Sequence, residues 1–232
     1  MPTYLYCVLP AGCDPPAATR RGVDAVPVRG LDAAGVSAWV SDVADTSLAP
    51  SVARARAHDD VVRDAMARAT PVPARFGQVL ADDVALTRWL DERRGSLVES
   101  LARVRGCVEM TVRILLAGRE TPTPGPAPRE SGSAYLRWVR ERQQSRQSVT
   151  DQAEFLRQGV ARAVEEAGVV REVRWATVAL GARSLEAAHL VPRDLIARHR
   201  EVVRSAVERD NRMKVMLSGP WAPYTFCAAG HE

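Results

Sequence analysis

The strongest restriction on the fold comes from residues 108–116, where apolar side chains stand at every second position. Such alternation is typical of a β-strand that buries one face. Four prolines follow within residues 122–128, and proline fits neither the interior of a helix nor a central strand. The pattern therefore predicts a strand that leads into a connection on the surface.

A long helix is predicted after the prolines, over residues 133–168. Residues 140–148 are almost entirely polar, whereas the second half of the helix carries an apolar stripe at helical spacing. We therefore expect the first half to protrude and the second half to pack on a core. The stripe consists of Phe155, Leu156, Val160 and Val164.

Beyond this helix the sequence predicts a hairpin of residues 169–180 and 185–191 around a turn at 181–183. A helix is predicted to begin at 192–194, and a last strand to cover 212–217. The resulting order from residue 108 onward is βαββαβ. This order is that of the ferredoxin-like fold, in which right-handed crossovers place two helices on one face of a four-stranded antiparallel sheet.

The first half of the chain predicts three short strands, at residues 4–9, 23–28 and 36–43, which we expect to form a β-meander. A helix is predicted to begin at Ser51 and to end before Pro71. Residues 71–80 are expected to be extended, followed by a second helix that Asp82 and Asp83 cap and Gly106 ends.

A length of 232 residues suits two domains, each with its own core. The predicted fold class is α+β, with a small N-terminal domain of β-meander plus helices at residues 1–105. A C-terminal ferredoxin-like domain is expected at residues 106–218. An aromatic tail with two prolines, residues 219–232, is expected to close the structure in an extended form and to pack between the domains.

The composition argues against several classes of protein. The chain lacks a run of about 18 apolar residues and a secretory signal, so we expect a cytoplasmic protein that does not enter a membrane. Its four cysteines are scattered without a C-x-x-C pair or a matching histidine spacing. We therefore expect neither a metal site nor a disulfide framework, and no cofactor.

The positive charge is concentrated in the second half. Residues 1–118 hold 14 arginines and 14 acidic residues, which leaves the whole net charge of +4 to the remainder. A nucleic-acid interface is not favoured, because the predicted strands carry mostly aliphatic side chains rather than aromatic ones that stack on RNA bases. An arginine cluster in the long helix is therefore interpreted as a surface for an acidic protein partner, or as a solvated face. It consists of Arg137, Arg140, Arg142 and Arg146.

His58 is followed by two aspartates, which is one part of a possible catalytic set. Neither a nucleophile nor a set of metal ligands accompanies it, so we interpret His58 as a hydrogen-bonded histidine between the domains. His189 and His199 lie in different predicted elements and share no further ligand. A metal site at these two residues is not expected.

The Arg-Phe-Gly segment at 75–77 allows two interpretations. In the structural one, which we favour, Phe76 fills a core, Gly77 takes an unusual backbone angle and Arg75 caps a helix. In the other, Arg75 binds a carboxylate of a partner protein. Glu109, an acidic residue in an otherwise apolar strand, is a predicted partner for Arg75.

The tail places Trp221, Tyr224 and Phe226 within six residues, and side chains of this kind are costly to leave in water. Two prolines in the same segment favour an extended backbone. We expect the tail to fold back between the two domains. The alternative is that it docks on a partner or on another copy of the chain.

Four segments, taken in order, resemble the gas vesicle protein F/L family. They read H-x-x-V-V at 58–62, TPVPARFG at 70–77, GCVEMTVR at 106–113 and GPWAPYTF at 219–226. The segment GSAYL at 132–136, which opens the long helix, is also similar to that family. The resemblance spans almost the whole chain.

The resemblance implies a two-domain α+β accessory protein that is required for gas vesicle formation and contacts the major shell protein. Other gas vesicle accessory proteins are further expected partners, and no catalytic activity is attributed to the family. A scaffold, a nucleation factor and a chaperone for the shell subunit all remain open as roles. The alternative from another class is a small-molecule-binding regulatory module with ferredoxin-like domains.

Overall fold

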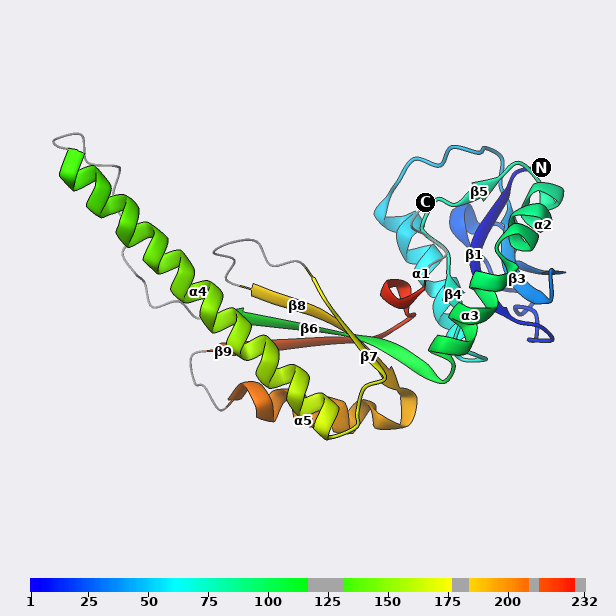
Figure 1. The fold of residues 1–232 in the computed structure, drawn as a ribbon. Helices are drawn as coiled ribbons and strands as arrows, with labels where there is room; N and C mark the ends of the chain where they lie inside the picture. The colour runs from blue at the N-terminus through cyan, green and yellow to red at the C-terminus, as the bar shows by residue number, and fades with distance from the viewer. Residues whose placement is uncertain (117–131, 177–183, 209–212, 228–232) are drawn as a thin grey trace. The chain divides into compact units, whose positions relative to one another are not determined.

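The computed structural model describes residues 1–116, 132–176, 184–208 and 213–227 (Figure 1). The fold is mixed α and β, with two sheets. The chain divides into two compact units, of which the first comprises Met1–Glu109 together with Pro220–Glu232 and the second comprises Met110–Gly219. The chain therefore passes from one unit to the other within two of its strands.

The sheet of the first unit is built around β1 (Thr3–Pro10). The strand order is β2-β3-β1-β4, and β5 also pairs with β1. Every residue of β1 except the last is buried, which requires cover on both faces of the sheet. The other strands are β2 (Arg29–Ala33), β3 (Val36–Asp42), β4 (Val72–Pro73) and β5 (Val79–Leu80).

The predicted meander is wrong, because β1 pairs with β3 and not with the next strand along the chain. Residues 23–28 do not form the expected strand; Val23–Ala25 is a 3-10 turn, and the strand begins at Arg29. Asp24 and Ala25 have φ angles of 53° and 58°, which lie in the left-handed region and are incompatible with a strand. The turn is held by Tyr6, whose phenol oxygen accepts a hydrogen bond of 2.9 Å from the Val23 amide.

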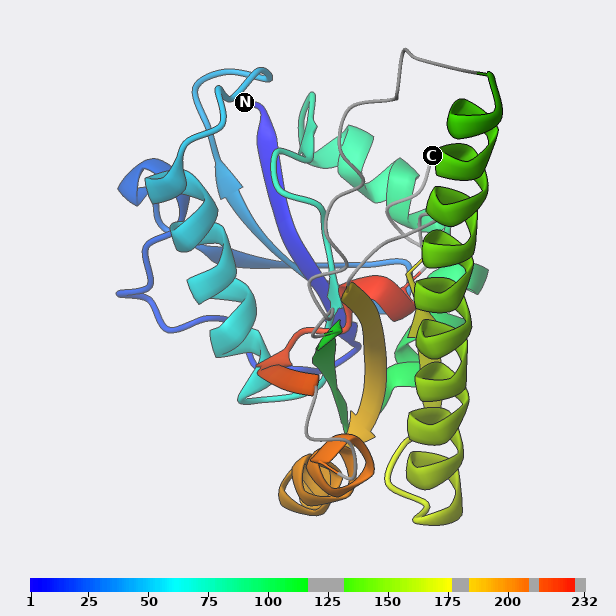
Figure 2. The ribbon, with the colours of Figure 1, turned by 90° about the vertical axis from the view of Figure 1, so that its left-hand side faces the viewer.

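Three helices accompany this sheet: α1 (Val52–Met66), α2 (Asp83–Glu92) and α3 (Arg94–Val104). Ser51 caps α1 and Asp82 caps α2, each accepting a backbone hydrogen bond with its side chain. The single helix predicted after Asp82 is thus two helices that meet at Arg93. Figure 2 shows α1 on one side of β1 and the α2–α3 pair on the other.

The second unit contains the sheet β7-β8-β6-β9 and two helices, α4 and α5. The apolar residues of both helices pack with those of the strands in one core, which includes Val112, Val160, Leu185 and Val203. The elements are β6 (Cys107–Leu116), α4 (Gly132–Glu166), β7 (Glu172–Trp175), β8 (Ser184–Pro192), α5 (Ile196–Glu208) and β9 (Met213–Trp221).

Two boundaries in the second half differ from the prediction. Strand β7, Glu172–Trp175, begins three residues later than predicted. Residues 177–180 of the predicted strand and the predicted turn at 181–183 lie outside the described residues. Strand β9 runs on to Trp221 and so includes the start of the predicted tail, while Tyr224–Phe226 is a 3-10 turn rather than extended chain. The tail is therefore shorter and more folded than two prolines suggest.

The first half of α4 extends beyond the ends of β6 and β8 in Figure 1. Among the α4 residues whose side chains the structure describes, Leu156 is the first that belongs to the core of the second unit, and Val160 and Val164 follow. The helix extends for more than five turns on the N-terminal side of Leu156. The polar run at residues 140–148 explains why this part can project into solvent. We call residues 132–150 the projecting half of α4.

Candidate functional site

His58 lies in α1 at the centre of an aromatic cluster in the first unit. Its Nδ1 atom is 2.9 Å from the phenol oxygen of Tyr4, and its ring packs edge-on against Phe76 at a centroid distance of 6.0 Å. The amide of Gly77 donates a 3.1 Å hydrogen bond to the same phenol oxygen. Since that oxygen accepts from Gly77, its own proton is available for His58, which places the imidazole proton on Nε2.

His58 is almost fully buried, and this burial lowers its pKa to about 4. The backbone of Ala74 and the charge of Asp59 act in the opposite direction but are weaker. The interaction with the Ala74 backbone is weak, because Nε2 of His58 makes no hydrogen bond with standard distance and angle. The imidazole is therefore neutral at pH 7. Its contacts with Tyr4 and Phe76, and the bond from Gly77 to Tyr4, indicate a structural role for His58.

Arg75, Phe76 and Gly77 form the turn between β4 and β5. Gly77 has a φ angle of +84°, a left-handed conformation that favours glycine. Phe76 is half-buried against Tyr4 and His58, while Arg75 is exposed. The turn thus joins the aromatic cluster through a backbone amide and a ring.

Glu109 anchors the tail within the first unit. Its side chain is buried, and it accepts hydrogen bonds of 2.8 Å from the Thr225 amide and 2.9 Å from the Thr225 hydroxyl. Both bonds join a carboxylate to neutral donors, a combination that is stronger than a neutral pair. The partner that sequence reasoning missed is therefore Thr225, and the pairing of Glu109 with Arg75 stays a prediction.

The three aromatic residues of the tail differ in burial. Phe226 is fully buried, whereas Trp221 and Tyr224 are each more than a third exposed. Burial of the phenol nevertheless raises the pKa of Tyr224, with the charge of Asp59 adding to the shift. The segment belongs to the first unit, and its bracing of the two domains stays a prediction.

The projecting half of α4 carries exposed apolar and basic side chains together. Tyr135 is 49% exposed and Leu136 is 65% exposed. Arg137 and Arg140 are also exposed, and neither has an ion-pair partner within the described part of the chain. The side chains of Arg142 and Arg146 lie outside the described residues.

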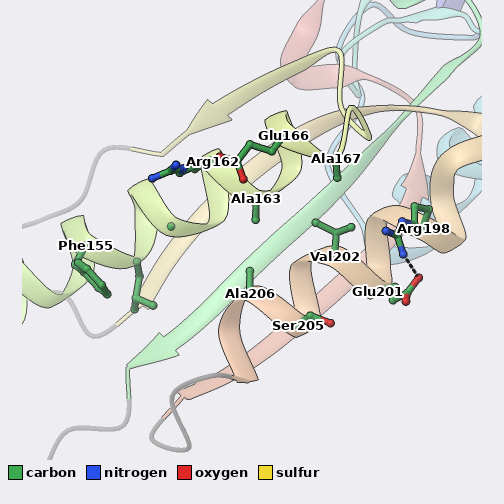
Figure 3. A pocket seen from close by; sticks show the side chains of 12 residues that line it. Phe155, Arg162, Ala163, Glu166, Ala167, Arg198, Glu201, Val202, Ser205 and Ala206 are labelled. Atoms are coloured by element: carbon green, nitrogen blue, oxygen red, sulfur yellow. Dashed lines mark hydrogen bonds and ion pairs between the residues drawn. The ribbon is translucent and has the colours of Figure 1, made fainter.

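An open groove of about 1140 Å³ runs between α4 and α5 (Figure 3). Small and apolar side chains line it together with four charged ones, and in the figure Ala163 points toward α5 while Val202 and Ala206 point toward α4. The charged side chains are Arg162, Glu166, Arg198 and Glu201. Phe155 stands at one end of the groove and is 77% exposed.

His189 and His199 form a buried pair in the second unit, with 2.8 Å between Nδ1 of His189 and Nε2 of His199. Burial lowers the pKa of both imidazoles. The charge of His199 lowers the pKa of His189 further, and the charge of Arg200 does the same for His199. Both rings are therefore neutral, and one donates to the other. The sequence showed no connection between them, because β8 and α5 bring them together only in the fold.

The described residues show no group of three or more histidine, cysteine, aspartate or glutamate side chains that could hold a metal ion. Within the same residues, none of the helices combines the length and the apolar character that crossing a bilayer requires. Several titratable groups with large pKa shifts, among them Tyr4, His58 and His189, are buried among aromatic or apolar neighbours. The arrangement is suited to holding the fold together and to presenting surfaces.

A family model described as gas vesicle synthesis protein GvpL/GvpF matches residues 2–228. Gas vesicle protein L of Streptomyces sp. (strain CB03234) is 31% identical over 245 residues, which cover 97% of this chain and 90% of that protein. Gas vesicle protein L1 of Halobacterium salinarum is 34% identical over 119 residues, which cover 48% of this chain and 42% of that protein.

Two crystal structures share the fold. Gas vesicle protein GvpF from Anabaena sp. PCC7120 superposes with a TM-score of 0.79 at 20% identity, covering 97% of this chain and 95% of that one. GvpF from Microcystis aeruginosa gives a TM-score of 0.70 at 20% identity, with 97% and 98% covered. The family match extends over nearly the whole sequence, and the chain belongs to the gas vesicle synthesis protein GvpL/GvpF family.

Proposed function

We propose that this protein is a non-enzymatic accessory factor that binds the major shell protein of the gas vesicle during assembly. A role in gas vesicle formation follows from the family to which the chain belongs. Binding of the shell subunit is the further step, and the projecting half of α4 supports it. We place the protein in the cytoplasm, associated with gas vesicles and with their other accessory proteins.

The observation that carries this proposal is the mixed surface of the projecting half. Leu136 and Tyr135 supply apolar area, and residues 137–146 hold four arginines against one glutamate. Arg137 and Arg140 have no ion-pair partner among the described residues, and exposed apolar side chains beside such cations suit a partner segment that is itself apolar and acidic. A shell subunit that has not yet assembled exposes apolar surface, and covering that surface would delay its aggregation.

The proposed domains also separate two roles, an internal one for the tail and partner binding for the second domain. We propose that residues 106–218 form a ferredoxin-like domain, because the order β7-β8-β6-β9 with one helix in each crossover is the arrangement expected for βαββαβ. The aromatic tail then has an internal role, since Phe226 is buried and Thr225 is bonded to Glu109. Partner binding is left to the surface of the second domain.

The alternative of a small-molecule regulatory module has less support. The groove between α4 and α5 contains four charged side chains, but each pairs along its own helix and not across the centre of the groove. Arg162 pairs with Glu166, and Arg198 pairs with Glu201. A ligand site would need polar groups that converge on one point.

A light-scattering assay tests the chaperone-like form of the proposal. The purified protein is added to shell subunit that is diluted from denaturant, and turbidity is followed over time. We expect a delay that grows with the amount of added protein and levels off near a fixed ratio. Turbidity that rises at the same rate as with an unrelated protein of equal mass would rule out the chaperone-like role.

A further inference from the structure

One of the side chains that fix α5 to the second unit is a histidine. Among the described side chains of α5, three are buried, namely His199, Val203 and Val207. They follow one another at intervals of four residues, so they form a single stripe on one face of the helix. Such a stripe is normally apolar throughout. At the first of its three positions α5 instead buries an imidazole.

Strand β8 supplies the second histidine from the same side of its sheet. Leu185, Ala187 and His189 are buried at alternating positions of β8, and Leu185 belongs to the core of the second unit. Trp175 of β7 packs edge-on against the His189 ring at a centroid distance of 6.3 Å. The 2.8 Å contact between the two imidazoles is therefore a polar link between β8 and α5 beside an aliphatic core.

The pair leaves two hydrogen-bonding atoms unsatisfied. A neutral imidazole has one donor and one acceptor nitrogen, and the bond between the rings uses one of each. The other two atoms are Nε2 of His189 and Nδ1 of His199, which are buried and have no hydrogen-bond partner within the described part of the chain. One of them carries a proton and the other can accept one. A proton taken up there would create a second buried donor without a partner, which is costly.

The charges around the pair oppose its protonation. Arg200 lies next to His199 in α5 and donates a 3.0 Å hydrogen bond to the Gly219 carbonyl, and its charge disfavours an imidazolium at His199. The ion-paired acidic side chains of the surrounding elements each have an arginine as partner, and they are Glu166, Glu172, Glu186 and Glu201. Glu165 and Asp194 are exposed. Among the described residues no carboxylate raises the pKa of either ring, so a charge on the pair stays uncompensated.

We propose that the His189–His199 pair is an acid-sensitive latch, whose protonation releases α5 from β8 before the sheet of the second unit opens. Protonated rings repel each other and are better solvated in water, so the charged pair favours the released helix. The proposal goes beyond shell-protein binding, because it concerns the interior of the second unit and needs no partner.

Helix α5 has few other contacts that would hold it in place. Val203 and Val207 are its other two buried side chains, and Val202 and Ala206, which line the groove toward α4, are half-buried. The helix has 13 residues, and helices shorter than about 12–15 residues are marginal in water without tertiary contacts. Once detached, α5 should therefore lose its internal hydrogen bonds, and its amides should exchange with solvent.

The pH range follows from the direction of the shifts. The pKa is lowered from 6.5 to about 3 for His189 and to about 4 for His199, so the released form binds protons more tightly than the closed one. Stability of the latch is therefore complete above about pH 6.5 and is lost as the pH falls below that value. At pH 5, one imidazole with a pKa of 6.5 when released and about 4 in place favours release by about thirtyfold.

Hydrogen–deuterium exchange of the full-length protein at pH 7 and pH 5, read by mass spectrometry, tests the proposal. After correction for the intrinsic exchange rate, we expect residues 196–208 to lose protection at least tenfold more than residues 110–116 of β6. His189→Leu together with His199→Leu replaces both rings by apolar side chains of similar size, and α5 should then stay protected at pH 5. His199→Leu alone removes one titrating ring and should reduce the loss.

The matched control is His58→Gln, which removes the buried histidine of the first unit and should leave the response of α5 unchanged. Three results would overturn the proposal: equal protection of α5 at both pH values in the wild type, an equal loss in the wild type and the double variant, or simultaneous loss in α5 and β6. A His58→Gln variant without the α5 response would overturn it as well. Other vesicle proteins are absent from the assay, so its outcome is independent of shell-protein binding.

Discussion

The bond between Glu109 and Thr225 gives a sharp test of how the tail is held. Thr225→Val keeps the shape of the side chain and the backbone amide but removes the hydroxyl that donates to the carboxylate at 2.9 Å. A hydrogen bond to a charged group contributes about 1.5–3 kcal/mol, and the acceptor is buried. We therefore expect Thr225→Val to lower the free energy of unfolding by about 2 kcal/mol.

A double-mutant cycle with Glu109→Gln isolates the pair from other partners of Glu109. Urea unfolding followed by circular dichroism gives the four free energies, with the midpoint expected to shift at constant slope. We expect a coupling energy of about 1 kcal/mol or more, as is typical of residues in one hydrogen-bond network. The control Thr87→Val should change stability by less than about 0.5 kcal/mol. A coupling of zero, or a Thr225→Val variant as stable as the control, would refute the anchoring role of Glu109.

Three further predictions concern the first unit. Because the pKa of His58 lies near 4 in the fold and near 6.5 when unfolded, His58 should account for a loss of stability of roughly 3 kcal/mol as the pH drops from about 6.5 to 4. The buried His189–His199 pair adds its own loss in this range, so His58→Gln should make the pH-dependent unfolding profile less steep without flattening it completely, and an unchanged profile would contradict the assignment. Gly77→Ala should cost about 1–2 kcal/mol through its left-handed backbone alone, since an added Cβ meets nothing within 4 Å, whereas Gly95→Ala in α3 should be neutral or stabilising; equal midpoints in urea would argue against this. Phe226→Ala should lower the free energy of unfolding by about 3–5 kcal/mol, and a loss below 1 kcal/mol would mean that the tail is not part of the core.

The elements that the sequence predicts well are those whose own periodicity decides their structure. Strand β6 and helix α4 follow from alternating and helical patterns, and the caps of α1 and α2 follow from Ser51 and Asp82. The sequence analysis missed the strand at Arg29–Ala33. This segment is polar and contains a glycine, so its strand signal is weaker than that of the apolar run before it. That run becomes a turn through a tertiary bond, from the Val23 amide to the Tyr6 phenol.

The candidate site shows the same limit. The Arg-Phe-Gly segment and the aromatic tail were visible as local patterns, and so was the exposed arginine-rich helix. The role of Thr225 could not be predicted, because its partner Glu109 lies 116 residues earlier in the chain. The His189–His199 pair was missed for the same reason, since contacts between elements are set by the fold and not by spacing.

Co-purification with the shell subunit tests the central claim most directly. The intact protein carries the affinity tag, and the charge-reversed variant is Arg137→Glu with Arg140→Glu on the projecting half of α4. The matched control, Arg56→Glu with Arg88→Glu, changes the net charge equally at exposed helix positions of the first unit. We predict that the shell subunit co-purifies with the intact protein and the control, and about tenfold less with the α4 variant, a loss of about 1.4 kcal/mol. Equal recovery with all three proteins, or none with the intact protein, would contradict the account.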